Sequence, residues 1–369
     1  MTTQRILVGS LAAGLPADAA TIILDLGPDH PTRAGLLEIN VVAAGDVVTS
    51  ARVLPGAMHR GVEKLFEARD YRQILMLADR HDWQAPFFGE LAAAEAFEGL
   101  LRLTPPPRAA WLRTLLAEHT RILSHLGFLG WVARTDVALA TRVRAARERL
   151  RGQTSRLTGN RIHPMAVRIG GVAVDPDGGW LDDEATLMTE LSQLAQELAG
   201  LPLPGDGLAM IDADLVDSFG LSGPLARAAG VPLDNRHHGP YAELGFDITR
   251  LGTTGDARAR FALLAAECQV SADVVRTCCA RLPDGPIQVR LPKIVKLPEA
   301  ESYSFVEAPL GRTGFHLVSR GDKTPWRMKL RSPSFHHVAA LEELLVGTPV
   351  AAVETVLASV GYVIGDVDK

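Results

Sequence analysis

The sequence predicts an α+β protein built around a bundle of long helices, with small antiparallel sheet elements near both ends. Alternating apolar and polar residues open the chain, apolar residues at three- and four-residue steps follow in its middle, and extended stretches return near its end. On this pattern we divide the chain into an antiparallel sheet region (1–58), a helical core (59–285) and an α+β region (286–369). The three regions are expected to pack as one integrated domain.

The opening sheet is expected to contain three strands, at 21–26, 37–42 and 47–54. The second strand alternates apolar residues with Glu38 and Asn40, and Gly45 and Asp46 supply the turn into the third. The apolar stretch 6–15 has some character of a secretory signal. One preceding positive charge makes a weak signal, so we do not assign one.

The helical core follows from apolar periodicity and from the residues that end each helix. Between Leu112 and Leu126 the apolar residues trace one helix face. Further helices are expected at 86–103, 136–151, 183–198, 256–281, 338–345 and 350–357. Residues 304–318 and 326–330 are expected to be extended and hairpin-like.

Composition excludes several classes of protein. The chain is 47% hydrophobic and 22% charged, as in ordinary globular proteins, and its net charge of −5 argues against nucleic-acid binding. Three closely placed cysteines are too few for a disulfide framework. No apolar run reaches the length of a membrane span. The arginines between 142 and 151 share their helix with Glu148, and we expect them to form a solvated or subunit-facing surface.

Blocks rich in glycine, proline, arginine and histidine are spread along the chain and mark the candidate site. Such residues are costly inside a fold, because buried charges need partners and unusual backbone dihedrals favour glycine. A shared functional site explains them better than packing does. The blocks lie at 27–31, 58–64, 79–83, 168–172, 222–224, 234–241, 303–309 and 331–335.

Taken in order, these blocks resemble the 49 kDa, or D, subunit of NADH-quinone oxidoreductase (respiratory complex I), a family related to the large subunit of nickel-iron hydrogenases. The blocks Gly27-Pro28-Asp29-His30-Pro31 and Arg331-Ser332-Pro333-Ser334-Phe335 are typical of it, and the resemblance implies a hydrogenase large-subunit-like fold. A hydrogenase needs two Cys-x-x-Cys pairs to hold its metals as thiolates. Residues 79–83 and 365–369 occupy those two places without cysteine, so we expect the chain to bind no metal of its own.

The resemblance further implies a peripheral subunit on the cytoplasmic face of the cell membrane. Such a subunit would wrap a partner that carries an iron–sulfur cluster, contact other complex I-like subunits, and reach the membrane only through its partners. At the shared interface it would form a cavity for quinone, which is the substrate, and it would bind no cofactor itself. Electrons would pass from NADH through the partner's clusters to the quinone.

Two residues at family positions next to the cluster are retained. Arg80 would place a permanent cation beside the cluster and raise its reduction potential, and His163 would change protonation when the cluster is reduced. His59 and Arg60 are counted with this group. An ordinary helix start with an Arg60–Glu63 ion pair accounts for these two equally well.

The positions that would contact the quinone headgroup differ from the family. Ala34 replaces a histidine. Trp83 replaces a tyrosine, and its indole N–H can donate a hydrogen bond but cannot give up a proton at working pH. The carboxylate that backs the missing histidine is displaced by one residue, to Asp136. His30 and His81 are then the nearest titratable side chains, and either is a candidate proton donor.

Two other functions stay open from the sequence. The chain could be a structural or assembly paralogue that keeps the partner interface but no longer admits quinone. It could also serve a related complex with another electron donor. The losses at Ala34 and Trp83 favour the structural role, whereas the retained Arg80 and His163 favour a cluster that is still tuned by this chain.

Overall fold

The computed structural model describes residues 2–236, 238–244 and 254–369. A four-stranded sheet opens the chain, with strand order β2-β1-β3-β4. Its strands are β1 (Thr2–Val8), β2 (Thr21–Leu24), β3 (Leu37–Ala44) and β4 (Val47–Leu54). Strand β1 was not expected, and β2 pairs with it in parallel, whereas the other pairs are antiparallel. The opening sheet is therefore mixed. The connection between β1 and β2 contains the 3₁₀ helix η1 (Ser10–Gly14) and carries the chain back, so that β2 runs in the same direction as β1.

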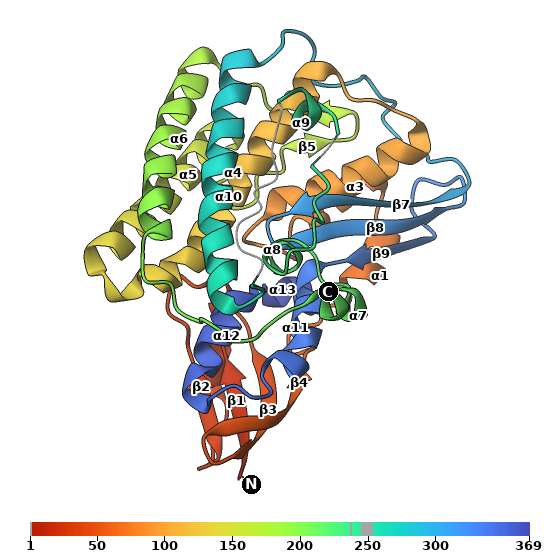
Figure 1. The fold of residues 1–369 in the computed structure, drawn as a ribbon. Helices are drawn as coiled ribbons and strands as arrows, with labels where there is room; N and C mark the ends of the chain where they lie inside the picture. Colours follow the sequence, from red (N-terminus) through yellow and green to blue (C-terminus); the bar gives the residue numbers. More distant parts are fainter. Residues whose placement is uncertain (1, 237, 245–253) are drawn as a thin grey trace.

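The long helices confirm the predicted bundle. Asp136, Asp177 and Asp256 each cap a helix by accepting a hydrogen bond from a backbone N–H in its first turn. Figure 1 shows α4, α5, α6 and α10 packed side by side, and α10 contacts both α4 and α6. The long helices are α3 (Pro86–Leu101), α4 (Pro107–Val132), α5 (Val137–Thr158), α6 (Gly178–Ala199) and α10 (Ala257–Arg281).

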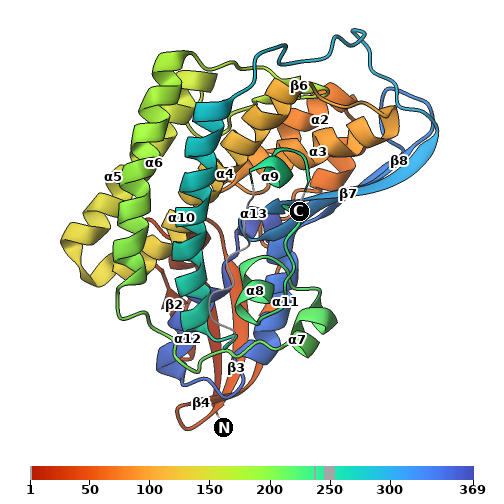
Figure 2. The ribbon, with the colours of Figure 1, turned by 45° about the horizontal axis from the view of Figure 1, so that its top comes forward.

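A three-stranded antiparallel sheet covers the other side of α3. Its strands β7 (Ala300–Ala308), β8 (Gly311–Ser319) and β9 (Arg327–Arg331) form the expected hairpin-like region. Helix α3 packs against both α4 and this sheet (Figure 2). The two-residue strands β5 (Val167–Arg168) and β6 (Gly171–Val172) make a small antiparallel pair beside the bundle.

Shorter helices connect these parts. They are α1 (Val62–Glu67), α2 (Tyr71–Ala78), α7 (Ala213–Phe219), α8 (Pro224–Ala228), α9 (Pro240–Glu243), α11 (Pro333–Leu344), α12 (Val353–Val360) and α13 (Ile364–Val367). The remaining 3₁₀ helices are η2 (Pro31–Arg33), η3 (Ala133–Thr135) and η4 (Val350–Ala352). Within the described parts of the chain, no helix is both long enough and apolar enough to cross a membrane.

The two ends of the chain pack together, as Figure 1 shows for the C-terminal helices and the N-terminal sheet. Asp368 accepts hydrogen bonds from the backbone N–H groups of Gly56 (2.7 Å) and Met58 (2.8 Å). One hydrophobic core fills the bundle, and a second lies between the N-terminal sheet and the C-terminal helices. Trp83 packs against both cores, so the candidate site lies where they meet.

Candidate functional site

A cavity of about 260 Å³ lies where the loop after β2 meets the loop between α2 and α3. The residues that line it include His30, Ala34 and Trp83, which are three of the five residues expected near a headgroup. Gln84 and Arg147 belong to the same wall. The fold thus brings together residues of three segments that lie far apart in the sequence, at 30–34, 83–84 and 147.

His30 is a buried residue at the start of η2. Its Nδ1 lies 2.7 Å from Oγ1 of Thr32, and its ring meets Phe128 edge-on with 5.5 Å between ring centroids. Burial lowers the pKa of His30 to about 3. The imidazole is therefore neutral at pH 7, and it lacks the near-neutral pKa that the sequence suggested for a proton donor.

His81 does not line this cavity. Its Nδ1 lies 2.8 Å from Oδ1 of Asp366 in α13, and both side chains are buried. A Cβ on the neighbouring Gly365 would lie only 2.2 Å from a ring carbon of Trp83, so the chain end packs directly on the indole. Burial, with a contribution from Asp366, raises the pKa of the adjacent Asp82 to about 7. The C-terminus therefore closes on the loop 79–83 through a His–Asp pair.

Arg80 and His163 meet on one carboxylate. Nε of Arg80 lies 2.7 Å from Oδ1 of Asp79, and Nδ1 of His163 lies 3.5 Å from Oδ2 of the same residue. The Asp79 side chain is fully buried, whereas those of Arg80 and His163 are 43% and 20% exposed. The structure thus places both predicted residues together at the surface, on a buried anchor to which the sequence assigned no role.

His59 and Arg60 lie exposed in the loop before α1, and neither lines the cavity beside His30. The alternative that the sequence left open, an ion pair between Arg60 and Glu63, does not form. Glu63 instead pairs with Arg327 and accepts a hydrogen bond from the backbone N–H of Leu330, because β9 lies against α1.

Asp136 is exposed and caps α5, where its carboxylate accepts a hydrogen bond of 3.0 Å from the backbone N–H of Leu139. It does not line the cavity beside His30. Asp136, which was expected to support the headgroup contacts, therefore caps a helix, and the structure does not place it at the cavity.

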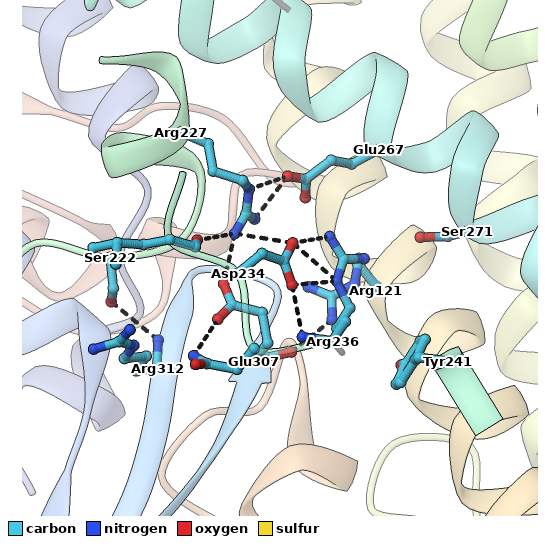
Figure 3. Close-up of polar contacts among 12 residues, drawn as sticks. Arg121, Ser222, Arg227, Asp234, Arg236, Tyr241, Glu267, Ser271, Glu307 and Arg312 are labelled. Atoms are coloured by element: carbon cyan, nitrogen blue, oxygen red, sulfur yellow. Dashed lines mark hydrogen bonds and ion pairs between the residues drawn. The ribbon is translucent and has the colours of Figure 1, made fainter. Parts of the chain in front are cut away.

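The sequence did not reveal a network of buried ion pairs that joins several elements (Figure 3). Arg227 of α8 lies 2.7 Å from Glu267 of α10 and 2.6 Å from Glu307 of β7. Asp234 lies 3.4 Å from Arg227 and 2.6 Å from Arg236. The sequence singled out Asp234 and Arg236 as part of a block, but their partners come from elements far along the chain. These contacts tie α8, α10 and β7 together.

A larger hollow of about 410 Å³ lies between α3, α4, α9 and β7. Its lining includes Glu95, Arg113 and Tyr241, but none of the residues expected at the headgroup. We therefore assign the candidate site to the smaller cavity. No group of three or more His, Cys, Asp or Glu side chains is placed to hold a metal in the regions that the structure describes.

The fold and the site define an α+β chain built on a bundle of long helices, in which residues 365–369, without cysteine, close on the loop after α2. The family of the respiratory-chain NADH dehydrogenase, 49 Kd subunit, matches residues 136–298 and 292–369. The chain belongs to this family.

Several relatives match this chain over nearly its full length, and all are D subunits of NADH-quinone oxidoreductase. The D 1 subunit from Streptomyces coelicolor is 40% identical and covers 98% of both chains. The D 2 subunit from Salinispora tropica is 41% identical over 100% of this chain and 99% of its own. The D subunit from Carboxydothermus hydrogenoformans is 34% identical over 94% of this chain and 98% of its own.

Proposed function

We propose that this chain is the D-type subunit of a membrane-associated NADH-quinone oxidoreductase and forms its quinone-reduction site with an iron–sulfur partner subunit. The observation that carries the proposal is the shared cavity of His30, Ala34 and Trp83, adjacent to the loop that bears Arg80. The relatives' names contain both NADH and quinone. We extend these substrates to the complex in which this chain acts.

The partner's cluster would supply the electrons, and the Arg80–Asp79–His163 group is the part of this chain suited to face it. Arg80 is a permanent cation that is partly exposed, and the buried carboxylate of Asp79 fixes the position of its guanidinium. A cation at this place favours the reduced, more negative state of a neighbouring cluster. His163 would offset the added charge by taking up a proton. The chain itself would bind neither nicotinamide nor cluster, and it would reach the cytoplasmic face of the membrane through its partners.

The cavity residues would hold the quinone by hydrogen bonds. Trp83 can donate its indole N–H to one quinone oxygen, and neutral His30 can donate one ring N–H. Such donors act where negative charge develops during reduction. Neither residue supplies a proton readily at pH 7, so the protons would come from solvent. In this proposal His81 acts through Asp366, by holding the chain end against Trp83.

Filling the cavity tests the proposal. Ala34 is exposed and lines the cavity, so Ala34→Phe is expected to leave the fold intact and to block the headgroup. We expect quinone reduction by the assembled complex to fall at least about tenfold. Electron transfer from NADH to a soluble artificial acceptor should be unchanged. Ala19→Phe, in an exposed loop, is the matched control.

The outcomes separate the candidate functions. Unchanged quinone turnover in a fully assembled Ala34→Phe complex would remove the proposed site. A wild-type complex that assembles but reduces no quinone would indicate the structural paralogue. Activity with another electron donor and none with NADH would indicate a related complex.

Loss of the Asp136 carboxylate is expected to weaken the fold but not the reaction. Asp136→Ala should lower the free energy of unfolding by about 1 kcal/mol, as the loss of a helix cap does, and leave quinone turnover unchanged. Asp177→Ala removes the corresponding cap of α6, a 2.7 Å hydrogen bond to the backbone N–H of Trp180, and should cost a similar amount. Denaturant unfolding compares the two. A fall in quinone turnover in Asp136→Ala alone would restore a catalytic role.

A further inference from the structure

Arg147 is a buried cation in the cavity wall. Only 5% of the residue is exposed, and it lines the cavity with His30 and Trp83. Its Nη1 donates a hydrogen bond of 3.2 Å to the backbone carbonyl of Asp29, and Nη2 donates one of 2.9 Å to Oε1 of Gln84. Both acceptors are neutral. The sequence suggested a solvated or subunit-facing surface for this stretch, and for Arg147 that expectation is wrong.

Within the described residues, no carboxylate oxygen lies within 4 Å of the Arg147 guanidinium. The buried arginines Arg113 and Arg227 each meet a carboxylate instead. Arg260 resembles Arg147 in that neutral acceptors hold it, but it does not line this cavity.

The nearest carboxylates that act on Arg147, those of Asp29 and Glu148, pair with Arg144 and Arg151 instead. A buried cation without a carboxylate in contact is costly, and its field favours any negative charge that forms nearby. Burial lowers the pKa of Arg147 to about 10, so the group still carries its charge at pH 7.

The position of Arg147 joins the two parts of the candidate site. Asp29 belongs to the loop that carries His30, and Gln84 follows Trp83 directly. Helix α4 leaves space for the guanidinium at Gly127, where a Cβ would lie 3.2 Å from Nη2 of Arg147 and 3.1 Å from Cγ of Pro31. The guanidinium of Arg147 therefore donates hydrogen bonds to both loops and packs closely against α4.

We propose that Arg147 stabilises the negative charge that forms on a quinone oxygen in this cavity, in place of the proton-donating side chains absent at Ala34 and Trp83. This inference rests on the proposed function. In the overall step a quinone takes two electrons, one after the other, from the partner's iron–sulfur cluster, which electrons from NADH reduce again after each transfer. It also takes two protons from water and becomes the quinol. No bond to the protein forms. A fixed cation lowers the energy of the charged oxygen before each proton arrives, and it needs no rearrangement to do so.

The charge of Arg147 can be removed while a hydrogen-bonding side chain is kept. In the assembled complex, Arg147→Gln is expected to lower kcat for quinone at least about tenfold with a smaller change in KM, and Arg147→Lys should recover most of that rate. The Gln variant should also become slower as pH rises, because protonation must then neutralise the oxygen without help from a cation. Electron transfer from NADH to a soluble artificial acceptor shows whether each variant complex is assembled.

Arg149 provides the matched control. It lies on the same helix but does not line the cavity, and its exposed guanidinium pairs with Glu190. Arg149→Gln is expected to change kcat less than about twofold. A purely structural role for Arg147 predicts a loss of assembly without a new pH dependence, and without recovery of kcat by lysine.

A measurement on the unmodified complex covers the case in which Arg147→Gln does not assemble. A hydroxynaphthoquinone that is an anion at neutral pH should inhibit quinone reduction more strongly than its neutral parent compound. Equal inhibition by the two compounds, or wild-type kcat in an assembled Arg147→Gln complex, would overturn the inference. If the proposed function itself is wrong, Ala34→Phe will also retain its quinone turnover, which distinguishes the two failures.

Discussion

Replacing Arg227 by methionine is expected to lower the free energy of unfolding by about 3–5 kcal/mol, because it leaves buried carboxylates without their cation. Arg227 contacts Glu267, Glu307 and Asp234, and all four side chains are at most 2% exposed. Globular domains are stable by only about 5–15 kcal/mol, so this one change consumes a large share of the total. Denaturant unfolding of the full chain, followed by tryptophan fluorescence, measures the loss.

Arg142→Met is the control for this experiment. Arg142 also pairs with a glutamate, Glu197, but the two side chains are 55% and 48% exposed. Water and salt screen such a pair, so its loss should change the free energy of unfolding far less than the loss of Arg227. Equal losses in the two variants would show that the buried network contributes no more than a surface pair.

Replacing Gly89 by alanine is expected to cost about 3 kcal/mol or more, because the new methyl group has no space. A Cβ at Gly89 would lie 1.8 Å from the backbone oxygen of Ala78 and 3.1 Å from Nε2 of His81. The first contact is with backbone, so relief requires that α3 or the loop 79–83 moves. That loop carries Arg80 and Trp83, and we therefore expect quinone turnover to fall together with stability.

Gly99→Ala tests the same chemical change on the same helix. Gly99 is exposed near the end of α3, and a Cβ there would meet nothing within 4 Å. Alanine is the better helix former, so this variant should gain about 0.5–1 kcal/mol. The denaturant midpoints of unfolding of the two variants compare their stabilities. If Gly89→Ala is as stable as Gly99→Ala, α3 is not in close contact with the end of α2.

Much of the helical core could be predicted from the sequence, because periodicity is a local property. Residues 256–281 were expected to be helical, and α10 spans Ala257–Arg281. The strand β1 was missed because its apolar residues continue into 6–15, and the parallel pairing of β2 depends on the path of the chain between them. Helix α6 begins at Gly178, before the predicted start at 183, because the Asp177 cap lies further upstream.

The candidate site was predicted in part. Ala34 and Trp83 were expected near one another through the resemblance, and they do line one cavity. Arg147 was assigned to a solvated or subunit-facing surface because arginines surround it in the sequence. Its helical spacing held a signal, since Val143 and Leu150 are buried on the same face of α5, four residues before it and three after it.

By itself the sequence determined the class of fold and the identity of the residues at the candidate site, such as Ala34 and Trp83, because residue identity and local periodicity decide these. Only the tertiary structure decided that Arg147 is buried without a carboxylate, and that His81 pairs with Asp366. Such facts depend on which residues meet across distances of up to 285 positions in the chain. Long-range packing sets those meetings, and through burial it sets the charge state and the hydrogen bonds of each group at the site.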